Sequence, residues 1–373
     1  MSTTIRAALG VAVGARVPVL LWGGAGLGKS SAVREMAVAA GLPCETVIAS
    51  IREPSDFAGL PIVSPQADSV RFAPPAWAQR LAESGRGVLF LDEISTAPPA
   101  VQAALLRVVL ERTVGDLELP DGVTVVAAAN PPEQAADGWD LSPPLANRFC
   151  HLDWDLDARE WAEGVLAGFE PAAVPVLDDE QLIGELTAAR AAVGAFVIAR
   201  GHLLHAHPGN EAMAGRAWPS PRSWEMAARL IAATTASGAA DAVRTVLVAG
   251  AVGPAAAAEF LAWREDLDLP DPETVLRDPT AFRLPERGDR AYAALAAITA
   301  AVLANNTTDR WRAAWLAIAA GTRDGHADIA VAAVRSLIAH RPEGAVPPSE
   351  VLSQMTPVLK TAGLFDVLTR GRK

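Results

Sequence analysis

An apolar segment that runs directly into a glycine turn constrains the fold of this chain more than any other feature. Residues 17–22 read VPVLLW, and residues 23–31 read GGAGLGKSS. The second stretch fits the pattern G-x-x-x-x-G-K-[ST], in which backbone N–H groups of the turn and of the following helix surround phosphate groups. In that pattern the lysine, here Lys29, reaches the β and γ oxygens, and the hydroxyl of Ser30 binds magnesium. The stretch therefore predicts a strand, a phosphate-binding turn and a helix, in that order.

The alternative interpretation is a glycine turn that binds nothing. Two observations favour phosphate binding. The turn lies between a strand pattern and a helix pattern, where the motif works. Lysine is also rare, because only Lys29, Lys360 and Lys373 occur among 32 basic residues. The pattern contacts phosphates and not the base, so it leaves ATP and GTP both open.

Short apolar or β-branched runs recur along the first 155 residues, and helical patterns separate several of them. These runs are residues 17–22, 45–49, 88–91, 123–129 and 149–153. Such alternation predicts an α/β fold with a buried, parallel five-stranded sheet and crossover helices. Two inserted hairpins are expected as well, one in residues 57–75 and one in residues 113–126, and we interpret both as interaction elements.

Strand patterns stop at about residue 155, and Ala- and Leu-rich helical patterns continue to the end. Residues 264–290 are rich in proline and charge, which indicates a linker or a long loop. The predicted organisation is a nucleotide-binding core in residues 1–155, a helical lid in 156–263, and a linker with a C-terminal helical extension in 264–373.

Polar residues follow two of the predicted strands. Asp92 and Glu93 end the run VLFLDE, and Asn130 ends the run VVAAAN. Asp92 is placed to hold magnesium through water, Glu93 to polarise an attacking water, and Asn130 to orient that water. Taken alone, the acidic pair is commonly a turn cap and the asparagine a turn residue. The upstream phosphate motif favours the catalytic interpretation.

Two arginines lie beside later motifs. Arg148 precedes the last predicted strand, and its guanidinium is a candidate to reach the γ-phosphate of another subunit. Arg222 follows Ser220 and Pro221, a predicted N-cap and first helical residue, so it places a cation where the helix dipole disfavours one. A nearby anion, such as a nucleotide phosphate, would explain that placement. A surface ion pair is the ordinary alternative for a single arginine such as Arg148.

Net charge, cysteine content and apolar stretches limit which binding partners and which cellular compartment are expected for this chain. The net charge of −11 and the pI of about 5.1 disfavour nucleic acid and anionic membranes as partners. Cys44 and Cys150 lie far apart, which indicates free, buried thiols in a reducing cytoplasm. The longest uncharged stretches, residues 245–258 and 291–304, are shorter than a spanning helix, so no membrane insertion is expected. The histidines of HLLHAH, residues 202–207, lack the carboxylate of a zinc-protease pattern.

The ordered segments GGAGLGKS, LFLDE, AAANP, ANRF and SPRSW resemble the AAA+ ATPases. Within them they resemble the MoxR-type family, of the helix-two-insert clade and the dynein-related AAA subfamily. The resemblance covers residues 1 to about 250, and the insertion after the second strand looks like that clade's hairpin. The tail beyond residue 264 is longer than the compact lid that is usual in the family.

The resemblance implies a role for each motif residue. Asp92 and Glu93 become Walker B, Asn130 sensor 1, Arg148 the arginine finger and Arg222 sensor 2. The Walker A segment, together with the serine that follows it, comprises Gly23, Gly24, Ala25, Gly26, Leu27, Gly28, Lys29, Ser30 and Ser31. The family further implies ATP and Mg²⁺ as cofactors, with Ser30 and Asp92 as the magnesium ligands. It also implies a homo-oligomeric ring, usually a hexamer, that remodels a protein partner often carrying a von Willebrand A domain.

Two other functions remain open from the sequence. A nucleic-acid-associated motor would grip a strand with its inserted hairpins, although the acidic charge argues against it. A nucleotide-gated assembly scaffold would need binding more than hydrolysis, and the presence of both Glu93 and Arg148 makes this less attractive.

Overall fold

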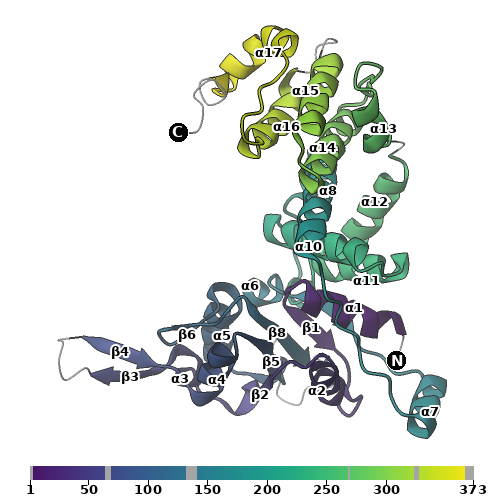
Figure 1. Ribbon diagram of the computed structural model, residues 1–373. Coiled ribbons are helices and arrows are strands. Elements are labelled where there is room, and N and C mark those ends of the chain that lie inside the picture. Colours follow the sequence, from purple (N-terminus) through teal and green to yellow (C-terminus); the bar gives the residue numbers. More distant parts are fainter. Residues whose placement is uncertain (1–2, 64–68, 132–140, 268, 323–326, 366–373) are drawn as a thin grey trace. The chain divides into compact units, whose positions relative to one another are not determined.

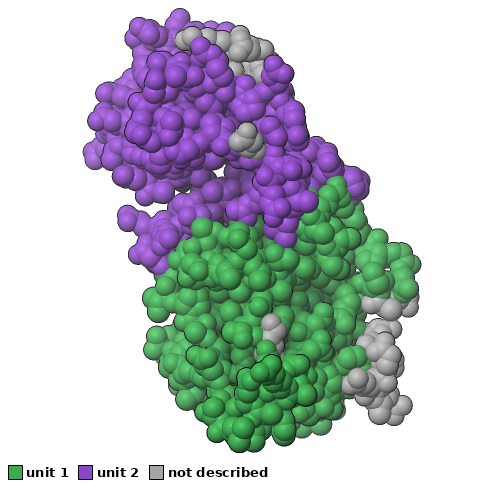
Figure 2. Space-filling view, turned by 90° about the vertical axis from the view of Figure 1, so that its right-hand side faces the viewer, with its two compact units in different colours: residues 1–177, 203–259 green, residues 178–202, 260–373 purple. Residues whose placement is uncertain are grey.

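A computed structural model describes residues 3–63, 69–131, 141–267, 269–322 and 327–365. The chain divides into two compact units, coloured separately in Figure 2. Unit 1 comprises residues 1–177 and 203–259, and unit 2 comprises residues 178–202 and 260–373. This division differs from the predicted boundaries, because the first long helix after residue 155 groups with the C-terminal helices. The three functional domains named from the sequence remain a prediction.

Unit 1 is built on a five-stranded parallel sheet with the strand order β2-β5-β8-β1-β9 (Figure 1). The strands are β1 (Val19–Trp22), β2 (Cys44–Ile48), β5 (Arg86–Asp92), β8 (Gly122–Ala129) and β9 (Cys150–Asp153). Val19 pairs with Val126 of β8 on one side and with Cys150 of β9 on the other. The predicted α/β fold and its five-stranded parallel sheet are thus confirmed.

Burial explains why these runs form strands. All four residues of β1 and residues 87–91 of β5 are buried, as expected for a parallel sheet covered on both faces. Helix α5 (Pro99–Glu111) presents Val101, Leu105 and Val108 to the same core. The other helices near the sheet are α1 (Thr3–Gly14), α2 (Lys29–Ala39), α3 (Ser55–Ala58), α4 (Ala76–Ser84) and α6 (Pro143–Ala146).

Both predicted hairpins form. One pairs β3 (Leu60–Val63) with β4 (Val70–Ala73) and projects from the sheet in Figure 1, and the other pairs β6 (Thr113–Val114) with β7 (Leu117–Glu118). The base of the first hairpin touches the turn of the second, since a Cβ on Gly59 would lie 2.7 Å from the Cα of Gly115. The first hairpin exposes large apolar side chains, namely Leu60, Ile62, Val63, Val70 and Phe72.

The rest of unit 1 is helical. Its elements are α7 (Ala158–Ala167), α9 (Glu211–Ala214), α10 (Pro221–Ala236), α11 (Asp241–Val252) and the start of α12 (Pro254–Glu265). Ser220 caps α10 in a reciprocal capping box with Ser223, and Pro221 is its first residue. The cap predicted before Arg222 is confirmed. Trp224, Ala228 and Ile231 are buried.

Unit 2 consists of helices. They are α8 (Asp179–Ala199), α13 (Pro272–Arg277), α14 (Gly288–Ala304), α15 (Thr308–Thr322), α16 (Ala327–Ala339) and α17 (Ser349–Thr361), together with the end of α12. The edge-to-face rings of Trp311 and Trp315 lie in its core. The predicted linker, residues 264–290, contains the short helix α13.

One described helix, α8, has the length and apolar composition of a membrane-spanning segment. This helix is not one of the longest uncharged stretches of the sequence, because Glu185 and Arg190 interrupt its apolar run. Helix α8 packs along α14, where Gly184 lets Ala304 approach closely. A core helix of a folded domain shares this composition, and the absence of membrane insertion remains a prediction.

Candidate functional site

The glycine turn between β1 and α2 forms one wall of a cleft. Gly26 and Gly28 have φ angles of +81° and +78°, which a residue with a Cβ adopts only with strain. The Lys29 ammonium donates hydrogen bonds to the carbonyl oxygens of Gly23 (2.6 Å) and Gly24 (2.9 Å). Burial lowers the pKa of Lys29, and the carboxylates of Asp92 and Glu93 partly oppose that shift. The turn therefore presents a single buried cation among backbone groups.

Two oxygen ligands suited to magnesium meet at the end of β5. The Ser30 hydroxyl donates a hydrogen bond to Asp92 Oδ2 at 2.7 Å. The other carboxylate oxygen of Asp92 accepts from the backbone N–H of Glu93 at 3.0 Å. A hydroxyl and a carboxylate in contact are hard oxygen donors, which Mg²⁺ prefers. The residues present therefore fit the implied ion.

Glu93 is held beside Asp92 in an unusual backbone conformation. Its φ is +55°, in the left-handed region that is uncommon for a residue other than glycine. The Ser50 hydroxyl, from the short 3₁₀ turn Ala49–Ile51 after β2, donates a hydrogen bond to Glu93 Oε2 at 2.6 Å. Sequence reasoning missed Ser50, although it follows the strand that neighbours β5 and so lies at the same edge of the sheet.

Asn130 completes the cleft from the end of β8, which lies between β1 and β5. Its Oδ1 accepts a hydrogen bond from Lys29 Nζ at 3.0 Å. Ser95, also missed from the sequence, accepts from the Asn130 backbone N–H at 3.2 Å and donates to its carbonyl at 3.3 Å. The cavity has a volume of about 400 Å³, and Ala25, Gly26, Leu27, Gly28, Lys29, Ser30, Ser31, Arg34, Asp92, Glu93, Ala128 and Asn130 line it.

A second cavity of about 260 Å³ shares the glycine turn with the first. Trp154, Trp161 and Phe169 supply aromatic walls, and Arg6 and Glu35 supply charge. The Trp154 indole N–H donates to the Leu27 carbonyl at 3.2 Å, which fixes this wall against the turn. An aromatic cavity beside a phosphate turn suits a flat heterocycle.

Arg148 and Arg222 lie near each other and line neither of these two cavities. Burial lowers the pKa of Arg148, and the positive charge of Arg222 lowers it further. Neither arginine forms an ion pair with a carboxylate of the described residues, so the ordinary surface-pair interpretation finds no support there. Arg148 donates a hydrogen bond to the Pro144 carbonyl. Guanidiniums without a carboxylate partner attract anions, so the two are candidates for binding one.

The histidines at 202, 205 and 207 do not form a metal centre, since no group of metal-binding side chains occurs among the described residues. His205 and His207 instead pack edge-on against Trp218.

Both cysteines, Cys44 and Cys150, are free. Cys150 is buried, which raises its pKa, whereas Cys44 is only partly buried.

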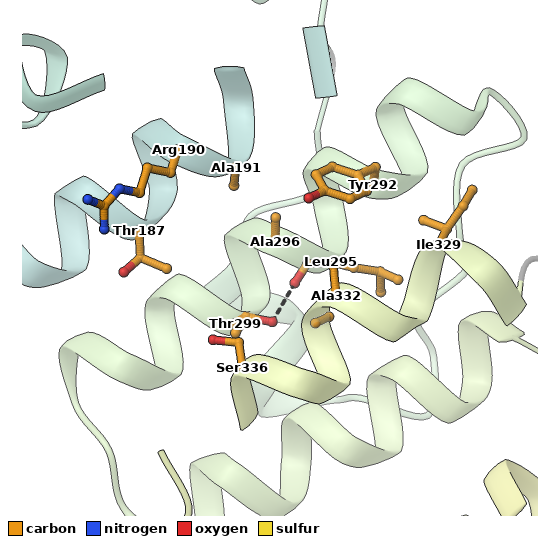
Figure 3. Close-up of a pocket in the computed structure, with 11 residues that line it drawn as sticks. Thr187, Arg190, Ala191, Tyr292, Leu295, Ala296, Thr299, Ile329, Ala332 and Ser336 are labelled. Atoms are coloured by element: carbon orange, nitrogen blue, oxygen red, sulfur yellow. Dashed lines mark hydrogen bonds between the residues drawn. The ribbon is translucent and has the colours of Figure 1, made fainter. Parts of the chain in front are cut away.

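A further groove lies within unit 2, away from these motifs (Figure 3). Helices α8, α14 and α16 line it, with Arg190 and Tyr292 among its polar side chains. The Thr299 hydroxyl is bonded to the Leu295 carbonyl of its own helix, as the dashed line shows. The lining holds no carboxylate, so the groove lacks the magnesium ligands of the cleft in unit 1.

A buried histidine supports the strand that precedes the glycine turn. The Trp22 indole donates to His151 Nδ1 at 2.8 Å, so His151 carries its proton on Nε2, which donates to the Ala146 carbonyl at 2.9 Å. Burial lowers the pKa of His151 from 6.5 to about 4. The folded chain therefore keeps this imidazole neutral at pH values where the unfolded chain protonates it.

Lowering the pH from 6.5 to about 4 is therefore expected to destabilise the fold through His151. Unfolding takes up a proton in this window. The free energy of unfolding therefore decreases as the pH is lowered, by up to about 3 kcal/mol in total. Urea unfolding of the wild type and of His151→Gln at a series of pH values measures the effect. The variant should lack this part of the slope, and equal slopes would contradict the assignment.

Residues 18–149 match the family model of the AAA domain (dynein-related subfamily). Among solved structures, that of a candidate ATPase from Cytophaga hutchinsonii ATCC 33406 is similar at 19% identity and a TM-score of 0.40, over 72% of this chain and 87% of that chain. A comparison with curated proteins finds no match. The matched segment contains the whole cleft and ends just after Arg148. Residues 18–149 are therefore similar to an AAA domain of the dynein-related subfamily, and their parallel sheet and glycine turn form an α/β P-loop core.

Proposed function

We propose that this chain is a Mg²⁺-dependent, ATP-hydrolysing remodelling ATPase of the MoxR type that acts on a protein partner. One observation carries the enzymatic part. Lys29, the Ser30–Asp92 pair, Glu93 and Asn130 converge on one cavity from three separate segments, namely the start of α2 and the ends of β5 and β8. A structural turn would not need a cation, a magnesium-type ligand pair and a further carboxylate in a single cleft.

The cleft residues divide the chemistry among them. Lys29 and the backbone N–H groups of the turn bind the β- and γ-phosphates. Ser30 and Asp92 hold the magnesium ion, which neutralises phosphate charge when it is bound. Glu93 accepts a proton from the attacking water, and its hydrogen bond from Ser50 fixes the carboxylate that does so. Asn130 orients the same water.

We place the nucleoside in the second cavity, beside Trp154 and Leu27. This cavity shares the turn with the first one, Asp92 and Glu93 do not line it, and its aromatic walls suit a purine. ATP is the proposed nucleotide because of the family resemblance, and the cavity by itself does not favour adenine over guanine.

Arg148 and Arg222 support a proposal about assembly. Because they lie together and line neither cavity of their own subunit, we infer that both serve the nucleotide of a neighbouring subunit. Each subunit then completes the site of the next, which requires a head-to-tail homo-oligomer. A ring, as a hexamer in the cytoplasm, is the assembly that we propose.

The exposed hairpin β3–β4 supports a protein partner. Leu60 is 61% exposed and Val63 is 74% exposed, and apolar side chains displayed in this way are typical of protein interaction surfaces. The proposed partner carries a von Willebrand A domain. A nucleic-acid motor is the second candidate, but only Arg71 contributes a positive charge to the described strands of this hairpin.

A capture experiment tests this proposal. Glu93→Gln protein loaded with ATP and Mg²⁺ is used to recover partners from native lysate, in parallel with the same protein loaded with ADP. A von Willebrand A protein enriched only with ATP would support the proposal. Recovery of nucleic acid, together with ATPase stimulation by it, would favour the motor instead.

A further inference from the structure

The side chain of Asn147 connects two segments that are far apart in the sequence. Its Nδ2 donates a hydrogen bond to the Trp218 carbonyl at 2.9 Å, and its Oδ1 accepts one from the Ser220 hydroxyl at 2.6 Å. Asn147 is only 4% exposed, and Ser220 is 5% exposed. Both ends of a buried amide are thus satisfied, an arrangement that resists displacement because any broken bond leaves a buried polar group unpaired.

The contacts of Ser220 extend this connection to α10. The Ser220 hydroxyl accepts from the backbone N–H of Ser223 at 3.1 Å, and the Ser223 hydroxyl accepts from the backbone N–H of Ser220 at 2.8 Å. The Ser223 hydroxyl also donates to the Trp218 carbonyl at 2.9 Å. The hydroxyls of Ser220 and Ser223 thus each donate one hydrogen bond and accept another. Asn147 is therefore hydrogen-bonded to the capped N-terminus of α10, whose first turn carries Arg222.

Arg148 directly follows Asn147 in the chain. The positive charge of Arg222 acts on its guanidinium, since it contributes to the lowered pKa of Arg148. Arg148 is half-buried and Arg222 is exposed, and two like charges do not attract each other. The hydrogen bonds of Asn147, in contrast, join the backbone segments from which both side chains project.

We propose that Asn147 is a positioning residue that holds Arg148 and Arg222 together as one anion-binding unit. This inference rests on the proposed function, in which the unit acts on the nucleotide of the neighbouring subunit. The residue before Asn147 is held by a separate hydrogen bond, because the Ala146 carbonyl accepts from the His151 ring. Loss of Asn147 should therefore loosen the two arginines and leave the subunit's own cleft intact.

The test combines Asn147→Ala with mixing of subunits. We expect kcat to fall by up to about 10²-fold, as for a small misplacement of a catalytic group, with ATP affinity unchanged. Lys29→Ala subunits have no working cleft of their own but carry intact arginines. Mixing them with Asn147→Ala subunits should restore turnover, as it should for Arg148→Ala subunits. Thr234→Val, which removes another buried hydroxyl from α10, is the control and should keep wild-type turnover.

The outcomes separate this inference from the function on which it rests. Normal turnover of Asn147→Ala would overturn it, and so would a loss that Lys29→Ala subunits restore for Arg148→Ala but not for Asn147→Ala. If Arg148→Ala is not restored, or if the wild type does not hydrolyse ATP, the proposed function fails and the inference fails with it. Should Asn147→Ala not fold, Ser220→Ala keeps the amide and removes the 2.6 Å hydrogen bond to it, together with the cap bond from the Ser223 backbone N–H, and the same outcomes apply to it.

Discussion

Replacing Glu93 by glutamine is expected to lower ATP turnover by about 10²- to 10⁴-fold, the usual contribution of a general base. The amide keeps the size of the carboxylate and can still accept a hydrogen bond from Ser50, but it cannot take a proton from water. Lys29, Ser30 and Asp92 are unchanged, so ATP binding should persist. Phosphate release in steady state and calorimetric titration with ATP and Mg²⁺ measure the two properties separately.

Two further variants sharpen this prediction. Glu83→Gln, on the exposed face of α4, makes the same chemical change outside the cleft and should leave turnover unaltered. Ser50→Ala keeps the Glu93 carboxylate and removes only its hydrogen bond, so its loss should be smaller than that of Glu93→Gln. Undiminished hydrolysis by Glu93→Gln would show that another group activates the water.

Arg148→Ala is expected to reduce turnover by about 10³- to 10⁵-fold, the range measured when an arginine that stabilises transferred phosphoryl charge is supplied or lost. Its own cleft is untouched, so the defect should appear in kcat. Because the arginine acts on a neighbour, the specific activity of the wild type should rise with protein concentration through the range where subunits assemble. Turnover assays across a dilution series measure this dependence.

Mixing distinguishes action in trans from action within one subunit. Arg148→Ala and Lys29→Ala should each be inactive alone and active together, since the first supplies a cleft and the second supplies the arginine. Arg107→Ala, on the exposed face of α5 where Arg107 pairs with Glu111, is the control and should be active by itself. An inactive mixture of two folded proteins would place Arg148 outside the catalytic site.

The sheet and the cleft could be predicted because their signals are local. The strand, glycine turn and helix around Lys29 are contiguous, and the carboxyl ends of neighbouring parallel strands must meet at one edge. Asp92, Glu93 and Asn130 were therefore placed in one cleft without any knowledge of the packing. The cap at Ser220 was predicted for the same reason, since it depends only on adjacent residues.

The features that were missed depend on contacts between distant segments. Ser50, Ser95 and Asn147 are ordinary polar residues in the sequence, and only the tertiary structure brings them to Glu93, Asn130 and Ser220. The grouping of α8 with α14 is equally non-local, because an apolar helical pattern does not identify the helix against which it packs.

The position of β9 at the edge of the sheet has a mechanical consequence. Among the described strands, β1 is hydrogen-bonded on both sides, whereas β9 is bonded to β1 alone and is otherwise covered by α11. The glycine turn follows the doubly bonded strand, and Arg148 lies two residues before the singly bonded one. We therefore expect a force that a neighbouring subunit exerts on Arg148 to displace β9 more readily than β1, which carries the phosphate-binding turn.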